Sequence, residues 1–116
     1  MNVYRIIKAE HIKNLLSGST AGGRWNFRGT PVIYTAENRA LACVEYLVHV
    51  PAAIIPKNLI MATIEIPDDI VPKEISMSKL PKYWKSYDPS SRELAELGTR
   101  WIIKVENLLL RVPSAV

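Results

Sequence analysis

The sequence predicts an α+β domain with a small mixed sheet at its core and about three helices beside it. Two patterns indicate this fold class. Residues 59–66 are almost entirely apolar, as in a buried strand, whereas residues 35–48 carry apolar side chains at helical spacing. A chain of 116 residues has room for one hydrophobic core, so we expect a single domain over residues 1–116.

Five segments are predicted to be strands. Residues 2–7 alternate enough to open the sheet, and residues 59–66 are expected at its centre because they are apolar on both faces. The remaining three segments are short, and a proline begins, interrupts or ends each of them: residues 31–34, 70–75 and 108–113. The sheet is therefore expected to contain four or five strands.

A first helix is predicted over residues 9–16 and a last one from a capping box at its start. In that box the Ser90 hydroxyl and the Glu93 carboxylate would satisfy backbone N–H groups of the first turn. The last helix continues through Trp101 and contains Gly98. A glycine inside a helix costs about 1 kcal/mol relative to alanine, so we expect a close packing contact at Gly98.

The middle helix, residues 35–48, has Thr35 as its expected N-cap residue. At about 100° per residue, one face of this helix is apolar and consists of Leu41, Val44 and Val48. Glu45 lies at the margin of that face. Because an unpaired carboxylate is costly to bury, Glu45 is expected to meet a donor such as Arg24 or Arg5, to face a ligand, or to extend to water.

Residues 22–34 combine glycines, arginines and aromatic side chains in a segment that has no regular pattern before its last four positions. Glycine lets the backbone approach a ligand closely, arginine offers a planar fork of donors to phosphate, and an aromatic ring can stack on another ring. This composition predicts a ligand-binding loop. The alternative is a structural turn closed by a packed Trp25.

The charge of the chain favours anionic partners. Fifteen Lys and Arg residues against eleven Asp and Glu residues give a formal net charge of +4. The basic residues are spread along the chain without a run of like charges, so no direct nucleic-acid contact is expected.

We expect neither a metal site nor a membrane segment. His11, His49 and the one cysteine, Cys43, lack the spacing of metal ligands, and a single thiol forms no disulfide framework. No secretory leader is recognisable, and Pro51 and Pro56 interrupt the apolar stretch that follows the middle helix. A reducing cytoplasm is the expected compartment.

Six sequence blocks, in this order, resemble the RES domain family. They are residues 4–5 (Tyr-Arg), 22–26 (Gly-Gly-Arg-Trp-Asn) with Gly29, 32–37, 42–45 (Ala-Cys-Val-Glu), 97–101 (Leu-Gly-Thr-Arg-Trp) and 111–116. Each block alone would be a weak signal, but several in the family order cover nearly the entire chain. Members of this family are toxins of bacterial toxin–antitoxin modules, paired with an Xre-like helix-turn-helix antitoxin.

The resemblance implies an ADP-ribosyltransferase-like fold and an activity that degrades NAD at the nicotinamide–ribose bond, by phosphorolysis or by hydrolysis. NAD would then be a substrate, phosphate a candidate co-substrate, and no cofactor would be required. The expected protein partner is the Xre-like antitoxin, in a toxin–antitoxin hetero-oligomer or beside a homo-oligomeric toxin.

The resemblance also assigns site residues. Arg24, Glu45 and Ser114 match the arginine, glutamate and serine of the family name and are the expected catalytic residues. Arg5 and Tyr34 match further positions of the same cleft and are expected to bind substrate. Trp25 and Trp101 are interpreted as packing residues, and a serine that only satisfies local backbone is the alternative for Ser114.

Two other functions stay open at this point. The chain could transfer ADP-ribose to a protein acceptor, or it could be a non-catalytic basic binding module. The chain also ends two residues after Ser114, where family members usually continue. We therefore expect a RES-like domain that lacks the usual C-terminal segment, as a truncated chain, a naturally short member or a degenerate toxin.

Overall fold

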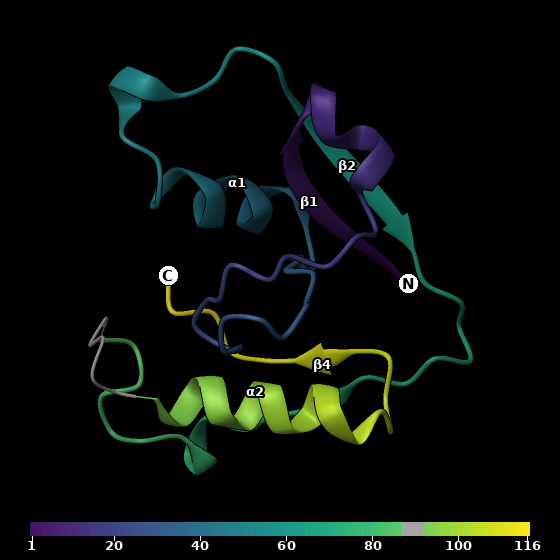
Figure 1. The fold of residues 1–116 in the computed structure, drawn as a ribbon, viewed down its shortest axis with the longest axis vertical. Helices are drawn as coiled ribbons and strands as arrows, with labels where there is room; N and C mark the ends of the chain where they lie inside the picture. The colour runs from purple at the N-terminus through teal and green to yellow at the C-terminus, as the bar shows by residue number, and fades with distance from the viewer. Residues whose placement is uncertain (87–91) are drawn as a thin grey trace. The chain divides into compact units, whose positions relative to one another are not determined.

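The computed structural model describes residues 1–86 and 92–116, and the chain divides into two compact units. Unit 1 consists of Met1–Ser17 and Ile33–Asp68, and unit 2 consists of Gly18–Val32 and Asp69–Val116. The helices and strands of both units are labelled in Figure 1. The α+β class predicted from the sequence is confirmed, whereas the single-domain organisation and the likeness to ADP-ribosyltransferases stay predictions.

Unit 1 contains a two-stranded sheet and helices of two kinds, where η denotes a 3₁₀ helix. Its elements are β1 (Asn2–Lys8), η1 (Ala9–Asn14), α1 (Arg39–Leu47), η2 (Ala52–Ile54) and β2 (Leu59–Glu65). β1 and β2 are antiparallel, with Asn2 opposite Glu65 and Lys8 opposite Leu59. The first predicted strand and the apolar strand are thus confirmed, and the first predicted helix is of the 3₁₀ type.

β1, and not the apolar strand, is the central strand of unit 1. On one side β1 pairs with β2, and on the other Tyr4 and Ala36 exchange two backbone hydrogen bonds of 2.8 Å each. Within the described residues, β2 pairs with β1 alone. The prediction that residues 59–66 lie at the centre of the sheet was therefore wrong, because an apolar run does not distinguish a central strand from an edge strand covered by other parts of the chain.

One face of β1 is turned toward the apolar interior of unit 1. Val3 and Ile7 are buried, and Arg5 lies between them on the same face because side chains alternate along a strand. The residue opposite Arg5 on β2 is Ala62, whose small side chain is also buried. An arginine opposite an alanine has room for its long side chain on a face that is otherwise filled by aliphatic groups.

α1 begins at Arg39, and its cap lies three residues after the predicted one. Asn38 is the N-cap residue, and its Oδ1 accepts the backbone N–H of Leu41 at 2.7 Å. Thr35 as N-cap was therefore wrong: both residue types can cap a helix, and asparagine is the more effective of the two.

α1 packs against β1 with a different face from the predicted one. The buried residue of the helix is Ala42, whereas Val44 and Val48 are 42% and 55% exposed. The prediction of an apolar face made of Leu41, Val44 and Val48 was thus wrong for Val44 and Val48. A small side chain such as that of Ala42 lets the helix backbone approach the sheet closely, which large aliphatic side chains do not allow.

Residues 31–34 form no strand. Val32 makes an isolated bridge with Ser19, and the two residues exchange backbone bonds of 3.0 and 3.2 Å. Pro31 has no N–H to offer a ladder. The strand prediction for this segment was wrong for that reason.

Unit 2 contains β3 (Lys73–Glu74), η3 (Met77–Lys79), α2 (Glu93–Lys104) and β4 (Leu110–Arg111). β3 and β4 are parallel and very short, so the predicted strands at 70–75 and 108–113 are confirmed in place but not in length. α2 confirms the last predicted helix. Of its predicted capping box, Ser90 lies outside the described residues, and Arg92, which directly precedes the helix, makes no side-chain capping bond.

The close contact expected at Gly98 is present. A Cβ atom added at this position would collide with the backbone carbonyl of Trp25. Trp25 itself is buried, with 7% of its surface exposed. Glycine at position 98 therefore lets the residues around Trp25 lie directly on α2, and the prediction that Trp25 is a packing residue is confirmed.

Candidate functional site

The glycine loop of unit 2, residues 22–29, is fixed by several buried or backbone contacts. Gly22 and Gly29 have φ values of +83° and +94°, which favour glycine over residues with a side chain. Asn26 is 2% exposed, and its Nδ2 donates to the Thr30 carbonyl at 2.8 Å. The Phe27 N–H donates to Thr99 Oγ1 of α2 at 2.9 Å. The loop thus has a defined conformation.

Arg24 is half-buried within this fixed loop. Its Nη1 donates to the carbonyl oxygen of Trp84 at 3.0 Å, so the backbone at Trp84 orients the guanidinium. An arginine held by one backbone carbonyl loses less rotamer freedom when its other N–H groups bind an anion. No role was predicted for Trp84, because a tertiary contact through a backbone carbonyl leaves no local signal in the sequence.

Ser114 lies three residues beyond the end of β4 and is half-buried. Its Oγ accepts the backbone N–H of Val116 at 3.1 Å. This is the local backbone bond that the alternative interpretation of Ser114 describes. A hydroxyl can accept one bond and donate another, so the contact is also compatible with a ligand-binding role.

The other three predicted residues belong to unit 1. Arg5 is half-buried on the inner face of β1, and its Nη1 donates to the Leu15 carbonyl at 3.0 Å. Tyr34 is 43% exposed and lies two residues before Ala36, which is bridged to β1. Of the two predicted substrate-binding residues, Arg5 thus lies on β1 and Tyr34 lies on the segment that pairs with β1 at Ala36.

Glu45 is half-buried on α1, in agreement with a position at the margin of the buried helix face. It follows Ala42 by three residues and therefore lies on the same side of the helix. Tyr46, the next residue, lines one hollow together with Arg5. The elements that carry Glu45 and Arg5 are therefore neighbours within unit 1.

The hollow lined by Arg5 and Tyr46 has a volume of about 360 Å³ and lies entirely within unit 1. Sequence reasoning missed most of its polar lining, which comes from η1 and the residues on either side of it. The available signal was the regular spacing of polar residues by three along this segment, which matches a 3₁₀ helix. We predicted a helix there but not its type.

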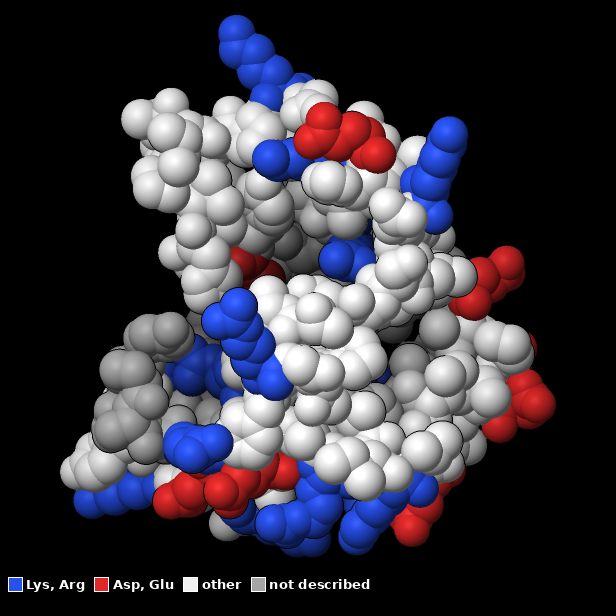
Figure 2. Space-filling view, in the orientation of Figure 1, with Lys and Arg blue, Asp and Glu red and all other residues white. Residues whose placement is uncertain are grey.

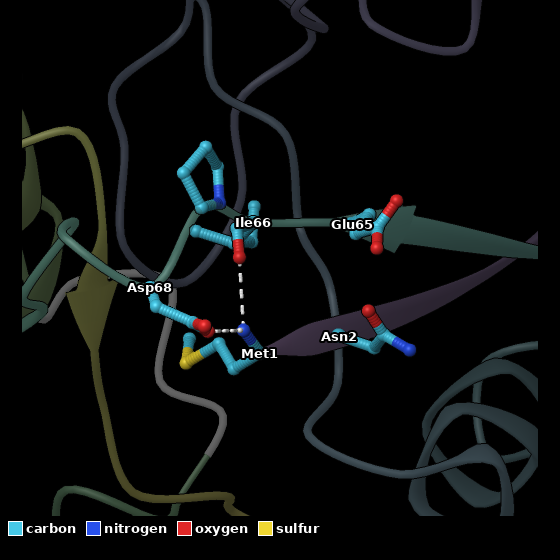
Figure 3. Close-up of a pocket in the computed structure, with 6 residues that line it drawn as sticks. Met1, Asn2, Glu65, Ile66 and Asp68 are labelled. Carbon is cyan, nitrogen blue, oxygen red and sulfur yellow. Dashed lines mark hydrogen bonds and ion pairs between the residues drawn. The ribbon is translucent and has the colours of Figure 1, made fainter.

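Another hollow on unit 1, shown in Figure 3, has a volume of about 280 Å³ and contains none of the predicted site residues. It lies where β1 begins and β2 ends. The Met1 ammonium donates to the Ile66 carbonyl at 2.8 Å and to Asp68 Oδ1 at 3.3 Å. These contacts close the end of the sheet, and we assign this hollow no function.

The predicted site residues are divided between the two units. Arg5, Tyr34 and Glu45 belong to unit 1, and Arg24 and Ser114 belong to unit 2. That the two groups converge on one bound dinucleotide stays a prediction.

Charged residues are mixed on the surface. On the face seen in Figure 2, Lys and Arg side chains lie at several separate places, and Asp and Glu side chains lie between them.

Residues 1–86 and 92–116 contain neither a metal-binding cluster nor a membrane-spanning helix. No three His, Cys, Asp or Glu side chains there lie together in a way that could hold a metal ion. No helix in the same ranges has the length and apolar character needed to cross a membrane.

Comparison with known proteins gives a consistent set of relatives. A model of the RES domain family matches residues 2–116. A Prs ADP-ribosylating toxin from Sphingobium sp. (strain YBL2) is 37% identical over 106 residues, covering 87% of this chain and 65% of that toxin. Proteins named Toxin Res from Photorhabdus laumondii and Yersinia enterocolitica are 31% and 32% identical across 100% of this chain, which covers 75% and 77% of their respective lengths.

Proposed function

This chain belongs to the RES domain family, and from that premise we propose that it is a toxin that cleaves the nicotinamide–ribose bond of NAD. The acceptor of the ADP-ribosyl group would be phosphate or water. With phosphate the products are ADP-ribose 1-phosphate and nicotinamide, and with water they are ADP-ribose, nicotinamide and a proton. Both reactions deplete NAD.

The observation that carries this proposal is the family match over residues 2–116, a range that includes all five site residues expected from the sequence motifs. The relatives named above are toxins, which supports the toxin role. The half-buried Glu45 on α1 and the oriented guanidinium of Arg24 on a fixed loop agree with catalytic roles.

We assign the electrostatic part of catalysis to Glu45. As the bond to nicotinamide breaks, positive charge develops on the ribose in an oxocarbenium-like transition state. A carboxylate fixed beside that charge stabilises the transition state more than the ground state. Nicotinamide leaves as a neutral molecule, so the reaction needs no general acid.

The remaining residues would bind and orient the substrate. Arg24 and Arg5 can hold the pyrophosphate of NAD, or an attacking phosphate, by charge-assisted hydrogen bonds. Tyr34 can stack on a ring or bond a ribose hydroxyl. Ser114 can bond the carboxamide, a ribose hydroxyl or the incoming phosphate.

Transfer of ADP-ribose to a protein acceptor is the second candidate function. It is favoured by the Sphingobium relative, whose name describes ADP-ribosylation of Prs. The bond that breaks is the same, and the new bond forms to a nucleophilic side chain of the acceptor, which loses a proton. The two candidates therefore differ in the acceptor alone.

NAD labelled with ³²P in its adenylate phosphate separates these candidates. The purified chain is incubated with the labelled NAD in buffer, in buffer with phosphate, and in an extract of bacterial protein. Label in free ADP-ribose or ADP-ribose 1-phosphate supports NAD depletion, whereas label retained on protein supports transfer. If NAD stays intact in all three mixtures while circular dichroism shows a folded chain, both enzymatic proposals are wrong.

The variant Glu45→Gln tests the electrostatic role of Glu45. It keeps the side-chain size and removes the charge, so we expect a loss of rate of about 100-fold or more, as for other preorganised electrostatic groups. Glu96→Gln is a matched control because Glu96 is exposed on α2. Equal rates for the two variants would contradict the role of Glu45.

For the partner and the compartment, we propose an Xre-like antitoxin and the cytoplasm. The first rests on the family and on relatives named Toxin Res. The second rests on the single cysteine of the chain. Co-expression with the neighbouring antitoxin gene product should restore growth of cells that the toxin arrests.

A further inference from the structure

The larger hollow on unit 1 is lined mainly by groups that donate hydrogen bonds. Its polar lining consists of Arg5, Lys8, His11, Asn14, Ser17 and Tyr46. Guanidinium, ammonium, imidazole, amide and hydroxyl groups can all donate to an anionic oxygen. All six residues belong to unit 1.

Four of these residues are aligned by the 3₁₀ geometry of η1. Lys8, His11, Asn14 and Ser17 follow one another at intervals of three, and a 3₁₀ helix has three residues per turn, so that positions i and i+3 are eclipsed. The pattern continues past the end of η1, because the Ser17 N–H donates to the Asn14 carbonyl at 3.0 Å. One side of this segment therefore presents a row of polar groups to the hollow.

The lining has a positive charge and contains no carboxylate. Arg5 and Lys8 are the fixed cations. Glu10 is the nearest acidic group on this segment: its Oε1 lies 3.7 Å from Nε2 of His11, and both side chains are 61% exposed. An exposed ion pair of this kind contributes little to stability. Among the described residues, neither Arg5 nor Lys8 forms an ion pair with a carboxylate.

Arg5 is oriented before any ligand arrives. The bond from its Nη1 to the Leu15 carbonyl holds the guanidinium against the chain that follows η1. The buried Ala62 opposite Arg5 on β2 leaves room for this arrangement. A guanidinium fixed in this way loses little conformational entropy on binding an anion, and its fork of donors fits two oxygens of a phosphate.

We propose that this hollow binds a phosphate group, with Arg5 and Lys8 as its charged ligands and His11, Asn14, Ser17 and Tyr46 as further donors. The phosphate group is either inorganic phosphate or part of a dinucleotide such as NAD. The assignment of this phosphate group to NAD rests on the proposed function, but the phosphate site itself does not.

Titration of the ¹⁵N-labelled chain with sodium phosphate, against sodium chloride at equal ionic strength, tests the site by nuclear magnetic resonance. We expect saturable shifts of the amide signals of residues 5–8 and 11–17. Arg5→Gln should weaken the apparent affinity by more than about tenfold, because it removes a bidentate, charge-assisted contact.

Two lysine variants make the test independent of whether Arg5→Gln folds. Lys8→Gln should weaken the affinity for phosphate by about fivefold, the loss expected for one exposed charged contact. Lys13→Gln removes the same charge from an exposed position on η1 that does not line the hollow. It should leave the affinity unchanged, and an equal loss in both lysine variants would overturn the proposal.

A second titration with ADP-ribose, which has a pyrophosphate but no nicotinamide to cleave, identifies the source of the phosphate group. If ADP-ribose abolishes the shifts caused by inorganic phosphate, the hollow receives the pyrophosphate of the dinucleotide. If the two ligands bind together, the hollow receives free phosphate. If neither ligand moves the signals of residues 5–8 and 11–17, the proposal is wrong.

The result of the phosphate-binding test can be distinguished from the result of the NAD-cleavage test. A chain that binds phosphate in this hollow and leaves NAD intact would support the site and contradict the NAD-cleaving function. A chain that cleaves NAD but binds no phosphate in the hollow would support the NAD-cleaving function and contradict the phosphate site.

Discussion

The glycine loop of unit 2 and helix α1 of unit 1 each carry one of the expected catalytic residues, and they are held in place by different means. The loop around Arg24 has a buried tryptophan, a buried asparagine and two glycines with positive φ. α1, which carries Glu45, has Ala42 as its buried residue and a side-chain cap at Asn38. The irregular segment is thus the more tightly packed of the two.

This difference shows that regular secondary structure does not by itself indicate which part of a site is rigid. A loop without repeating backbone bonds is fixed by groups that each make a specific contact, and the loss of any one leaves a buried polar group or a steric collision. A short helix with one small buried residue depends on its cap and its own backbone bonds. Substitutions in the loop should therefore cost more stability than substitutions in α1.

The largest loss is expected for Gly98→Ala. Alanine is the better helix former, but its Cβ atom would collide with the Trp25 carbonyl, so the free energy of unfolding should fall by about 3 kcal/mol. All three tryptophans belong to unit 2, so urea unfolding followed by tryptophan fluorescence reports on this unit. Arg100→Ala, an exposed change on α2, is the control, and an unfolding free energy raised by Gly98→Ala would contradict the contact.

A smaller loss, about 2 kcal/mol, is expected for Asn26→Ala. The substitution removes the amide that donates to the Thr30 carbonyl inside the loop and leaves that carbonyl without this bond. The same fluorescence measurement applies. Arg28→Ala, an exposed change in the loop, should cost less than about 0.5 kcal/mol. Equal effects of the two substitutions would show that the loop is not fixed by its buried amide.

In α1, Asn38→Ala should cost about 1 kcal/mol because it removes the side-chain acceptor for the Leu41 N–H. Faster amide hydrogen exchange in the first turn of the helix would report this loss. Asn38→Asp keeps the acceptor and should restore protection. Thr35→Ala should have no effect on the helix, and a loss there equal to that of Asn38→Ala would favour the cap predicted from the sequence.

The smallest effect is expected for Val44→Ala, below about 0.5 kcal/mol, because this side chain is 42% exposed. Val3→Ala in β1 removes the same atoms from a buried position and should cost about 2 kcal/mol. Hydrogen exchange of the β1 and β2 amides measures both changes. Similar losses would mean that Val44 is part of the core of unit 1, as the sequence pattern predicted.

The parts of the fold that could be predicted are those in which a local pattern is sufficient. β1 and β2 follow from alternation and from an unbroken apolar run, and α2 follows from its helical period. The contact at Gly98 could be expected because a glycine inside a helix is unfavourable relative to alanine unless close packing excludes a side chain. The identity of its partner, Trp25, depends on a tertiary contact that no local pattern contains.

The errors have a common physical origin in competition between local signals of similar strength. Thr35 and Asn38 are both suitable N-cap residues, and the sequence alone does not decide between them. A pattern that counts large aliphatic residues favours Val44 and Val48 over the small Ala42, although close packing selects the small one. The candidate site residues were predicted from the resemblance to the RES family. The row of polar groups along η1 could not be predicted, because its alignment depends on the helix being of the 3₁₀ type.

Release of nicotinamide from NAD tests the central claim most directly, because this step is common to phosphate, water and protein as acceptors. The account predicts that the folded chain releases nicotinamide in at least one of these conditions and that Glu45→Gln reduces the rate by about 100-fold or more. A folded chain that releases no nicotinamide with any of the three acceptors, or a Glu45→Gln variant as fast as the parent chain, would contradict it.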